Sequence, residues 1–203
     1  MNKLPPSSFV VAGIGTDVGK TIVSALLVAK LKCLYWKPIQ TGIETDTSTI
    51  KELTLLPEHH FIKEAYHFQR PCSPHLAAAE EGATIDIETL HLPITDKQIL
   101  VELAGGLMTP CNNVQTNLDL IIKWKLPVVL VSRHYLGSIN HTLLSLLALQ
   151  QAKANLAGLV FVGEPDLDTE TRILLATPNT PWFRVPLSNA QPNYQWIQTL
   201  IKS

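Results

Sequence analysis

Short apolar runs alternate along the chain with longer segments in which apolar residues recur every three or four positions. Short runs rich in β-branched residues predict strands, whereas the three-to-four spacing predicts amphipathic helices. Strands are expected at residues 9–12, 34–37, 99–102, 128–132 and 156–162. Helices are expected at residues 22–31, 46–53, 73–81, 114–124 and 139–152.

The predicted strands are apolar throughout, as in Val128-Val129-Leu130-Val131. Such strands are typical of a parallel sheet that helices cover on both faces, with right-handed crossovers. The sequence therefore predicts an α/β fold built on a doubly wound parallel sheet. No long linker or shift in composition divides the 203 residues, so residues 1–203 are expected to form a single domain. In sheets of this kind, ligands bind beyond the carboxyl ends of the strands.

A glycine-rich segment, Gly13-Ile14-Gly15-Thr16-Asp17-Val18-Gly19-Lys20-Thr21, follows the first predicted strand and opens the first predicted helix. A strand that turns through glycines into a helix leaves backbone N–H groups free to bind phosphate oxygens. Lys20 can reach the outer phosphates of a nucleoside triphosphate, and the Thr21 hydroxyl can ligate the accompanying Mg²⁺. Ile14 stands where the strict pattern has glycine, so we interpret the segment as a variant P-loop rather than a chance glycine-rich turn. The expected fold is accordingly P-loop NTPase-like.

Charged residues follow the second and third predicted strands, where the fold would place a ligand. Lys37 precedes Pro38, whose fixed φ can hold the lysine so that its charge points into the site. We therefore interpret Lys37 as a catalytic candidate rather than a solvated surface lysine. Glu102 closes an apolar strand shortly before a pair of glycines, which suits a carboxylate on the Mg²⁺ side of a triphosphate. Asp46 is either a metal ligand or the N-cap of the helix at 46–53, and the sequence favours neither alternative.

The loop after the fourth predicted strand leads through Gly137-Ser138 into the helix at 139–152. The N-terminus of this helix is a second candidate anion site, because its free N–H groups and its dipole can hold a carboxylate. His141 lies in the first helical turn without an evident partner, so a structural role is favoured over acid–base catalysis.

Composition narrows the range of partners. The net charge is −1 and basic residues do not form runs or alternate with aromatic ones, so nucleic acid is not expected as a ligand. Residues 1–8 lack the apolar stretch of a signal peptide, and no apolar run is long enough to cross a membrane. We therefore expect a cytoplasmic protein that binds small molecules. The three widely spaced cysteines predict reduced thiols, and His59-His60 predicts a surface pair rather than a metal site.

Five groups of residues, in this order, resemble the motifs of the dethiobiotin synthetase family. They are Gly15-Thr16-Asp17-Val18-Gly19-Lys20-Thr21, Lys37-Pro38 with Thr41-Gly42, Ser73-Pro74-His75 with Glu81-Gly82, Glu102 with Gly105-Gly106, and Leu136-Gly137-Ser138-Ile139-Asn140-His141. The resemblance spans residues 9 to about 160 and implies an ATP- and Mg²⁺-dependent ligase of biotin biosynthesis. Members of that family carboxylate 7,8-diaminopelargonic acid with CO₂ and close the ureido ring, releasing ADP and phosphate.

The resemblance also implies roles for individual residues. Lys37 would neutralise the carbamate formed on the substrate and Lys20 the transferring phosphate, while Thr16 and Thr41 would orient reacting groups. Mg²⁺ would be held by Thr21, Asp46 and Glu102. The residues expected to bind the nucleotide are Gly15, Asp17, Val18, Gly19, Lys20, Thr21, Ile22, Asp46, Glu102, Gly105 and Pro186. The residues expected to bind the substrate are Lys37 and Thr41 together with Gly137, Ser138, Ile139 and Asn140, which in a homodimer would serve the site of the partner subunit.

The chain also departs from the family pattern. Leu103 stands where the family has glycine, which would place a side chain beside the phosphate path and strain the backbone if its φ is positive. Val162-Gly163 replaces the asparagine that reads adenine, so the backbone at 185–187, including Pro186, is the alternative site for the base. The segment 83–97 is short, which predicts a trimmed helix before the third strand.

Three other functions remain open. A dimeric P-loop switch would usually carry a lysine at the start of the loop, where this chain has Gly15, and DNA partitioning would want a basic surface. An amidoligase of cobalamin synthesis is normally fused to a glutaminase domain, and the chain has neither a catalytic Cys-His pair nor the added length. A degenerate relative, damaged at Leu103, would bind nucleotide without turnover.

Overall fold

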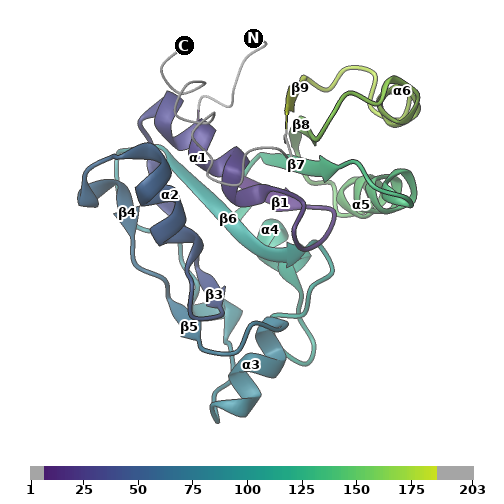
Figure 1. Cartoon of the computed structure of the whole chain (residues 1–203). Coiled ribbons are helices and arrows are strands. Elements are labelled where there is room, and N and C mark those ends of the chain that lie inside the picture. Colours follow the sequence, from purple (N-terminus) through teal and green to yellow (C-terminus); the bar gives the residue numbers. More distant parts are fainter. Residues whose placement is uncertain (1–6, 187–203) are drawn as a thin grey trace.

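The computed structural model describes residues 7–186, whose main feature is a seven-stranded parallel sheet in the order β4-β2-β6-β1-β7-β8-β9 (Figure 1). Its strands are β1 (Phe9–Gly13), β2 (Leu34–Trp36), β4 (Phe61–Ile62), β6 (Ile99–Gly106), β7 (Val128–Arg133), β8 (Leu156–Val162) and β9 (Trp182–Val185). β1 lies at the middle of the sheet, and later strands add to it on both sides. The doubly wound parallel sheet expected from the sequence is confirmed.

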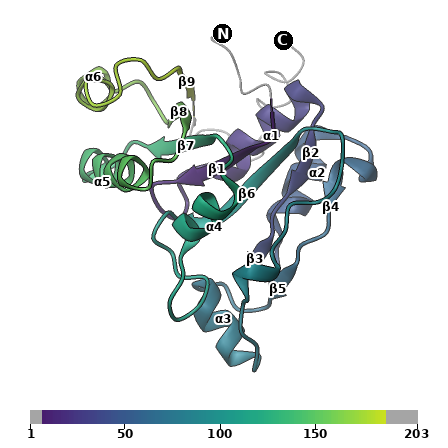
Figure 2. The ribbon, with the colours of Figure 1, turned by 180° about the vertical axis from the view of Figure 1, so that it is seen from behind.

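Helices cover both faces of this sheet, as the two opposite views show (Figures 1 and 2). They are α1 (Lys20–Leu31), α2 (Asp46–Thr54), α3 (Pro74–Glu80), α4 (Asn117–Trp124), α5 (Ser138–Gln151) and α6 (Leu167–Leu174). Buried residues of α1 and α2 pack with Phe9 and Val11 of β1, whereas those of α4, α5 and α6 pack with Val10 and Ala12. Because successive side chains of a strand point to opposite faces, a strand between two helical layers must be apolar at every position.

Several elements differ from the sequence-based expectation. The helix expected at 114–124 begins only at Asn117. Thr116 is its N-cap, and the N–H of Thr116 donates to the carboxylate of Asp119 at 2.7 Å, as in a capping box. β2 ends at Trp36, one residue before Lys37, while β6 continues past Glu102 to Gly106. The segment 83–97 holds the 3₁₀ turn η2 (Ile87–Thr89) in place of a trimmed helix.

Short or polar elements escaped prediction altogether. β3 (Ile39–Thr41) pairs with β5 (Tyr66–Phe68) in a separate two-stranded sheet, and β4 and β9 form the two edges of the main one. These strands are too short to give a pattern of alternation. α6 is largely polar and buries only Glu170 and Ile173, so its sequence resembles a loop.

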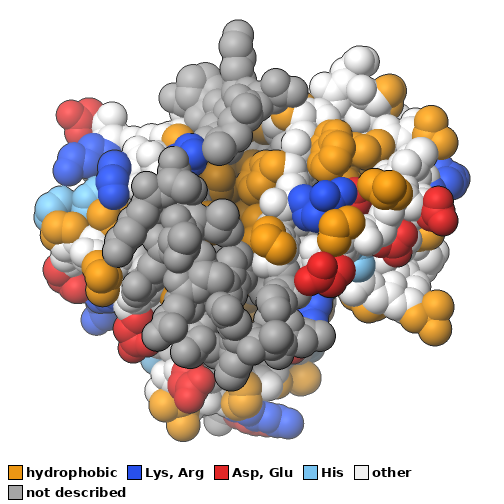
Figure 3. Space-filling view, turned by 45° about the horizontal axis from the view of Figure 1, so that its top comes forward, with side chains coloured by type: hydrophobic (Ala, Val, Ile, Leu, Met, Phe, Trp, Pro, Cys, Tyr) orange, Lys and Arg blue, Asp and Glu red, His pale blue; other side chains and the backbone are white. Residues whose placement is uncertain are grey.

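Exposed apolar side chains are present on the side of the molecule that carries β9 and α6 (Figure 3). Leu167 and Leu175 are 70% exposed, and the guanidinium of Arg184 lies over the ring of Trp182 at 5.9 Å. Among the helices of residues 7–186, none combines the length and apolar character that crossing a bilayer requires.

Candidate nucleotide and metal site

The glycine-rich segment forms a tight turn between β1 and α1. Gly19 caps α1 with a φ of 91°, in the left-handed region where glycine is favoured, and Asp17 shares that region with a φ of 56°. A Cβ on Gly13 would come within 2.7 Å of Val18 and 2.9 Å of the carbonyl oxygen of Gly15. The loop therefore has the close-wound backbone that directs N–H groups toward phosphate oxygens.

Lys20 folds back over this loop. Its Nζ donates to the carbonyl oxygen of Gly15 at 2.9 Å, and only 7% of the residue is exposed. Burial, together with the positive charge of Lys37, lowers the pKa of Lys20 to about 8. An anion bound in the loop would oppose both effects, so the position suits a lysine that gains a phosphate as its partner.

Two carboxylates, a hydroxyl and an ammonium group meet beside the loop. Oγ1 of Thr21 donates to Asp46 Oδ1 at 2.5 Å and lies 3.4 Å from Glu102 Oε1. Nζ of Lys37 bonds to Asp46 and lies 3.3 Å from the same Oε1 of Glu102. α1, α2, β6 and the end of β2 thus each contribute one member of a single cluster.

The electrostatics of this cluster favour charged side chains. Burial alone would lower the pKa of Lys37, but Glu102 and Asp46 outweigh it and hold that pKa above its ordinary value. Burial would likewise raise the pKa of the Asp46 carboxyl, yet Lys37 and the hydrogen bond from Thr21 bring it below its ordinary value. Lys37 is only 5% exposed and Glu102 is fully buried, so solvent screens the pair little.

The structure decides the alternative left open for Asp46. The N-cap of α2 is Thr45, whose side chain accepts a hydrogen bond from the N–H of Ser48 at 3.1 Å. Asp46 is instead the first helical residue, and its carboxylate points to Thr21 and Lys37. Asp46 therefore contributes to the cluster and does not cap the helix.

A cavity of about 890 Å³ opens over the loop and the cluster. The residues expected from the sequence that line it are Thr16, Asp17, Gly19, Lys20, Thr21, Ile22, Lys37, Thr41, Asp46, Glu102 and Gly105. Gly15 lines a neighbouring cavity of about 450 Å³, and Val18 is buried under the loop. Gly137, Ser138, Ile139 and Asn140, at the start of α5, do not line the larger cavity.

Other residues of the site were not anticipated. Arg133, at the end of β7, lines the cavity and donates through Nη1 to the carbonyl oxygen of Asp17 at 3.1 Å. Gln40 is 4% exposed and accepts a hydrogen bond from the N–H of Asp46 at 3.2 Å. Tyr35 is fully buried and donates to Glu102 Oε2 at 3.2 Å; burial and the charge of Glu102 raise the pKa of its hydroxyl well above the ordinary value. The position of Arg133 at a strand end is the one signal that could have identified it.

The expectation for Leu103 was wrong. Leu103 is 2% exposed and packs in the apolar layer between the sheet and α4, with a φ outside the left-handed region. β6 continues past this position, so Leu103 points away from Glu102 to the opposite face of the sheet. Gly105, with a φ of 71°, makes the turn beside the cavity instead.

A third cavity, of about 740 Å³, lies at the ends of β7 and β8, and Arg133 lines both this cavity and the larger one. Val162 is fully buried, and a Cβ on Gly19 would meet its side chain at 2.9 Å. Val162 thus packs on the P-loop and offers no polar group to a base. Pro186 is exposed and does not line this cavity, so its role in binding the base stays a prediction, and Leu187 lies outside the described residues.

The remaining sequence candidates lie elsewhere. The ring of His141 bonds with the hydroxyl of Tyr135 at 2.9 Å, and Nδ1 of His60 bonds with the carbonyl oxygen of Cys33 at 3.0 Å. Within residues 7–186, no three His, Cys, Asp or Glu side chains form a group that could hold a metal. All three cysteines are free thiols, as expected.

The parallel sheet, the glycine turn into α1 and the charged cavity above it define a P-loop nucleotide-binding protein. Residues 7–188 match the family model described as an AAA domain. The chain is 43% identical over 174 residues to the ATP-dependent dethiobiotin synthetase BioD of Rhodopseudomonas palustris (strain HaA2). The aligned residues make up 85% of this chain and 81% of that relative. It is 45% identical over 170 residues to the enzyme of that name from Christiangramia forsetii, an alignment that covers 83% of this chain and 82% of the relative. The chain belongs to the dethiobiotin synthetase family.

One solved structure supports the fold independently. The ParA family ATPase from Chlorobium tepidum TLS superposes with a TM-score of 0.55 at 11% identity, over 98% of this chain and 92% of that protein. At this identity the likeness concerns the arrangement of sheet and helices alone.

Proposed function

We propose that this chain is an ATP-dependent dethiobiotin synthetase, a ligase that makes dethiobiotin from 7,8-diaminopelargonic acid, CO₂ and ATP with release of ADP and phosphate. The observation that carries the proposal is the placement of Lys20 and Lys37 in one cavity, beside two carboxylates and a P-loop hydroxyl. A P-loop alone supports only triphosphate binding. A second buried cation, at the end of the neighbouring strand, suits a reaction in which a second anion meets the γ-phosphate.

The chemistry explains why two cations are needed. One substrate amine takes up CO₂ and loses a proton to give a carbamate, whose oxygen attacks the γ-phosphorus as ADP leaves. The second amine then attacks the carbonyl carbon of the mixed anhydride, phosphate leaves, and the ring closes. Because carbamate and triphosphate repel each other, cations fixed in a partly dry site supply much of the catalysis. Lys37 would hold the carbamate and Lys20 the transferring phosphoryl group, with Thr16 and Thr41 orienting the reacting groups at the cavity wall.

The oxygen ligands of the cluster suit Mg²⁺. Magnesium usually takes one or two carboxylates and completes its shell with water and phosphate oxygens. Asp46 and Glu102 offer two carboxylates, each within hydrogen-bond reach of the Thr21 hydroxyl. When bound there, the cation would neutralise charge on the outer phosphates.

The ammonium group of Lys37 bonds to both carboxylates that would bind the metal. Binding of the metal would therefore require the Lys37 side chain to move. A cation that takes Asp46 and Glu102 as ligands would displace the ammonium group from them. Lys37 would then be free to turn toward the acceptor, on the side of the cavity lined by Thr41 and Ser73. Binding of MgATP would in this way prepare the lysine for the carbamate.

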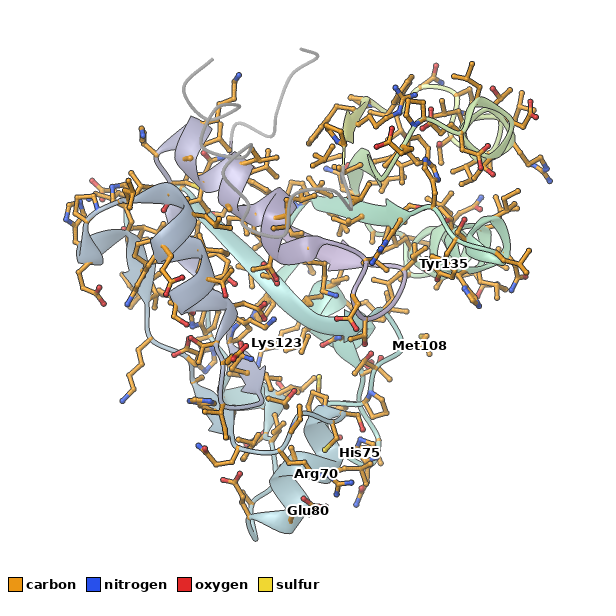
Figure 4. The ribbon with its side chains drawn as sticks, viewed as in Figure 1. Arg70, His75, Glu80, Met108, Lys123 and Tyr135 are labelled. Atoms are coloured by element: carbon orange, nitrogen blue, oxygen red, sulfur yellow. The ribbon has the colours of Figure 1, made fainter. Side chains whose placement is uncertain are left out.

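The start of α5 supports the expected homodimer. Gly137, Ser138, Ile139 and Asn140 stand away from this subunit's own larger cavity, so they are free to serve a partner's. Exposed apolar residues surround this region, with Met108 at 63%, Leu144 at 56% and Leu147 at 49% exposure. Figure 4 shows Met108 and Tyr135 on the same side of the molecule as α5. We propose that this side packs against a second copy in the cytoplasm, with the apolar chain of the substrate lying across the interface.

The burial of Leu103 bears on the alternative of a degenerate relative. That alternative required a side chain in the phosphate path, and Leu103 lies on the opposite face of the sheet. Lys37, which would serve the acceptor, contacts Asp46 and Glu102, the two carboxylates that would serve the metal. An active single-domain enzyme is therefore the function that the site supports best.

The test is direct. Purified protein is incubated with ATP, Mg²⁺, bicarbonate and 7,8-diaminopelargonic acid, and dethiobiotin is sought by mass spectrometry. Product that depends on all four additions would support the proposal; ATP binding with no product from a folded protein would overturn it. Light scattering of the same sample tests the dimer separately, because a monomeric active enzyme would contradict only that part.

A further inference from the structure

Tyr35 joins the apolar layer beneath α1 and α2 to the charged cluster. Its side chain is fully buried among residues such as Phe9, Leu53 and Leu100, and Oη donates to Glu102 Oε2 at 3.2 Å. The parallel pairing of β2 with β6 sets Tyr35 beside Leu100. Glu102, two residues further along β6, points to the same face of the sheet, so the ring reaches it diagonally.

The two oxygens of Glu102 have different neighbours. Oε1 faces the cluster, 3.4 Å from Thr21 Oγ1 and 3.3 Å from Lys37 Nζ, whereas Oε2 accepts the hydrogen bond from Tyr35. Because the carboxylate is fully buried, an oxygen without a donor would be costly. A donor on Oε2 also fixes the plane of the carboxylate and therefore the direction of Oε1.

The apolar layer itself does not require this hydroxyl. The ring of Tyr35 meets Phe61 edge-on with centroids 6.4 Å apart, a contact that phenylalanine could make equally well. A hydroxyl in such a layer must find a partner, and the partner here is a residue of the reaction site. The phenol is a neutral donor, so it orients the carboxylate without adding a further positive charge beside Lys37.

We propose that Tyr35 is a positioning residue for the metal site, and that its hydroxyl holds Glu102 so that Oε1 is aimed at the cation beside Thr21. This inference rests on the Mg²⁺ site of the proposed function. Partners that orient a metal-ligating carboxylate affect metal affinity even though they never touch the metal. Tyr35 should therefore set how tightly the metal binds, while the P-loop sets how tightly the nucleotide binds.

The experiment compares the wild-type protein with Tyr35→Phe and with a matched control, Tyr66→Phe. The hydroxyl of Tyr66 accepts from the N–H of Asp86 at 3.3 Å and has no contact with the cluster. Mn²⁺ replaces Mg²⁺ as a paramagnetic probe, and its binding is titrated by EPR in the presence of a non-hydrolysable ATP analogue. Binding of the analogue is also measured in EDTA, and circular dichroism and thermal unfolding report on the fold.

In Tyr35→Phe, the dissociation constant for Mn²⁺ should rise about tenfold, at the lower end of what losing such a partner costs a metal site. Analogue binding in EDTA should not change, and Tyr66→Phe should behave as wild type in both measurements. Equal Mn²⁺ affinity in Tyr35→Phe and wild type, or an equal loss of affinity for metal and for metal-free analogue, would overturn the proposal.

Two further outcomes distinguish a failure of the proposed role of Tyr35 from a failure of the proposed Mg²⁺ site. A wild-type protein that binds the analogue but not Mn²⁺ would overturn the Mg²⁺ site, and the role of Tyr35 with it. If Tyr35→Phe fails to fold, Tyr35→Met supplies a second side chain that fills space without a hydroxyl. The same tenfold loss of Mn²⁺ affinity is expected of it, and unchanged affinity in that variant would overturn the proposal.

Discussion

Nζ of Lys37 lies 3.3 Å from Oε1 of Glu102, the same oxygen that faces Thr21 at 3.4 Å. An ammonium group and a metal ion cannot both occupy the space in front of that oxygen at full charge, because like charges in a poorly screened site repel strongly. In the proposed metal site, Lys37 would therefore compete with the cation for Glu102 Oε1.

Replacing Lys37 with glutamine should separate metal binding from turnover. Without the ammonium group, Asp46 and Glu102 lose their competing cation, so metal affinity should rise. Turnover should fall about 100- to 1000-fold, the usual cost of removing one group that stabilises charge in a transition state. Mn²⁺ titration and dethiobiotin formation measure the two effects.

Lys30→Gln is the matched control for this variant. Lys30 is an exposed residue in the last turn of α1, so its replacement should leave both quantities unchanged. Turnover undiminished in Lys37→Gln would remove Lys37 from its proposed catalytic role, whatever happens to metal affinity.

The affinity for ATP should depend on pH through Lys20. Burial holds the pKa of the free protein's Lys20 at about 8, and a bound triphosphate should raise it, because the anion favours the charged lysine. Below pH 8 the lysine is already protonated and affinity should be level. Above pH 8 a proton must be taken up on binding, so affinity should fall up to about tenfold per pH unit.

Calorimetry in two buffers of different ionisation enthalpy measures this proton uptake directly. The uptake should be absent in Lys20→Met, which would bind ATP more weakly at every pH. Uptake that is the same in wild type and Lys20→Met would assign the linkage to another group.

Thr45 and Asp46 are neighbours with separable roles. Thr45→Ala removes the N-cap of α2 and should lower the free energy of unfolding by about 1 kcal/mol while leaving the metal dependence of turnover unchanged. Asp46→Asn keeps the cap but removes the negative charge that faces Lys37 and Thr21. The Mg²⁺ concentration needed for half-maximal turnover should therefore rise. Chemical denaturation and a Mg²⁺ titration of the rate distinguish the two, and a purely structural Asp46 would show the opposite pattern.

Two glycines allow backbone strain to be distinguished from a steric clash. Gly82→Ala, with a φ of 67° and open space around the added methyl, should cost about 1–2 kcal/mol from backbone strain alone. Gly19→Ala adds to this strain a clash with Val162 at 2.9 Å, and it should also abolish nucleotide binding.

The double variant Gly19→Ala/Val162→Ala tests the origin of that clash. Removing the two methyl groups of Val162 gives the new Cβ room, so part of the nucleotide affinity should return, as fluorescence titration can show. An affinity that stays lost would attribute the whole effect to the backbone of the P-loop and not to Val162.

How far the sequence predicts this molecule depends on the range over which each interaction acts. The strand-helix alternation and the P-loop are local patterns, and both are confirmed at β1 and α1. Lys37 and Glu102 were each predicted to lie where the sheet binds a ligand, because both stand at the ends of predicted strands, and Lys37 Nζ lies 3.3 Å from Glu102 Oε1. This step needed only the rule that parallel strands share an edge.

The features that sequence reasoning missed depend on register and side-chain direction. Leu103 was assigned to the cavity because its end of β6 was expected to be loop, and only the continuing strand turns it into the core. The contact of Tyr35 with Glu102 requires the exact pairing of β2 with β6, which no local pattern specifies. β3 and β5 pair only with each other, and neither three-residue strand has a sequence pattern that predicts it.

The alternation of side chains along β6 limits where the chain can gain or lose residues. The residues of β6 alternate between the two faces, so Glu102 joins the charged cluster beside Lys37 while Leu103, its neighbour, packs in the core. A deletion or insertion within the strand would exchange them, burying a carboxylate among apolar side chains and removing it from the proposed metal site. Changes of length are therefore tolerable in the irregular segment before Ile99 but not between Ile99 and Glu102. Homologous chains should vary in length on one side of that boundary and keep a constant spacing on the other.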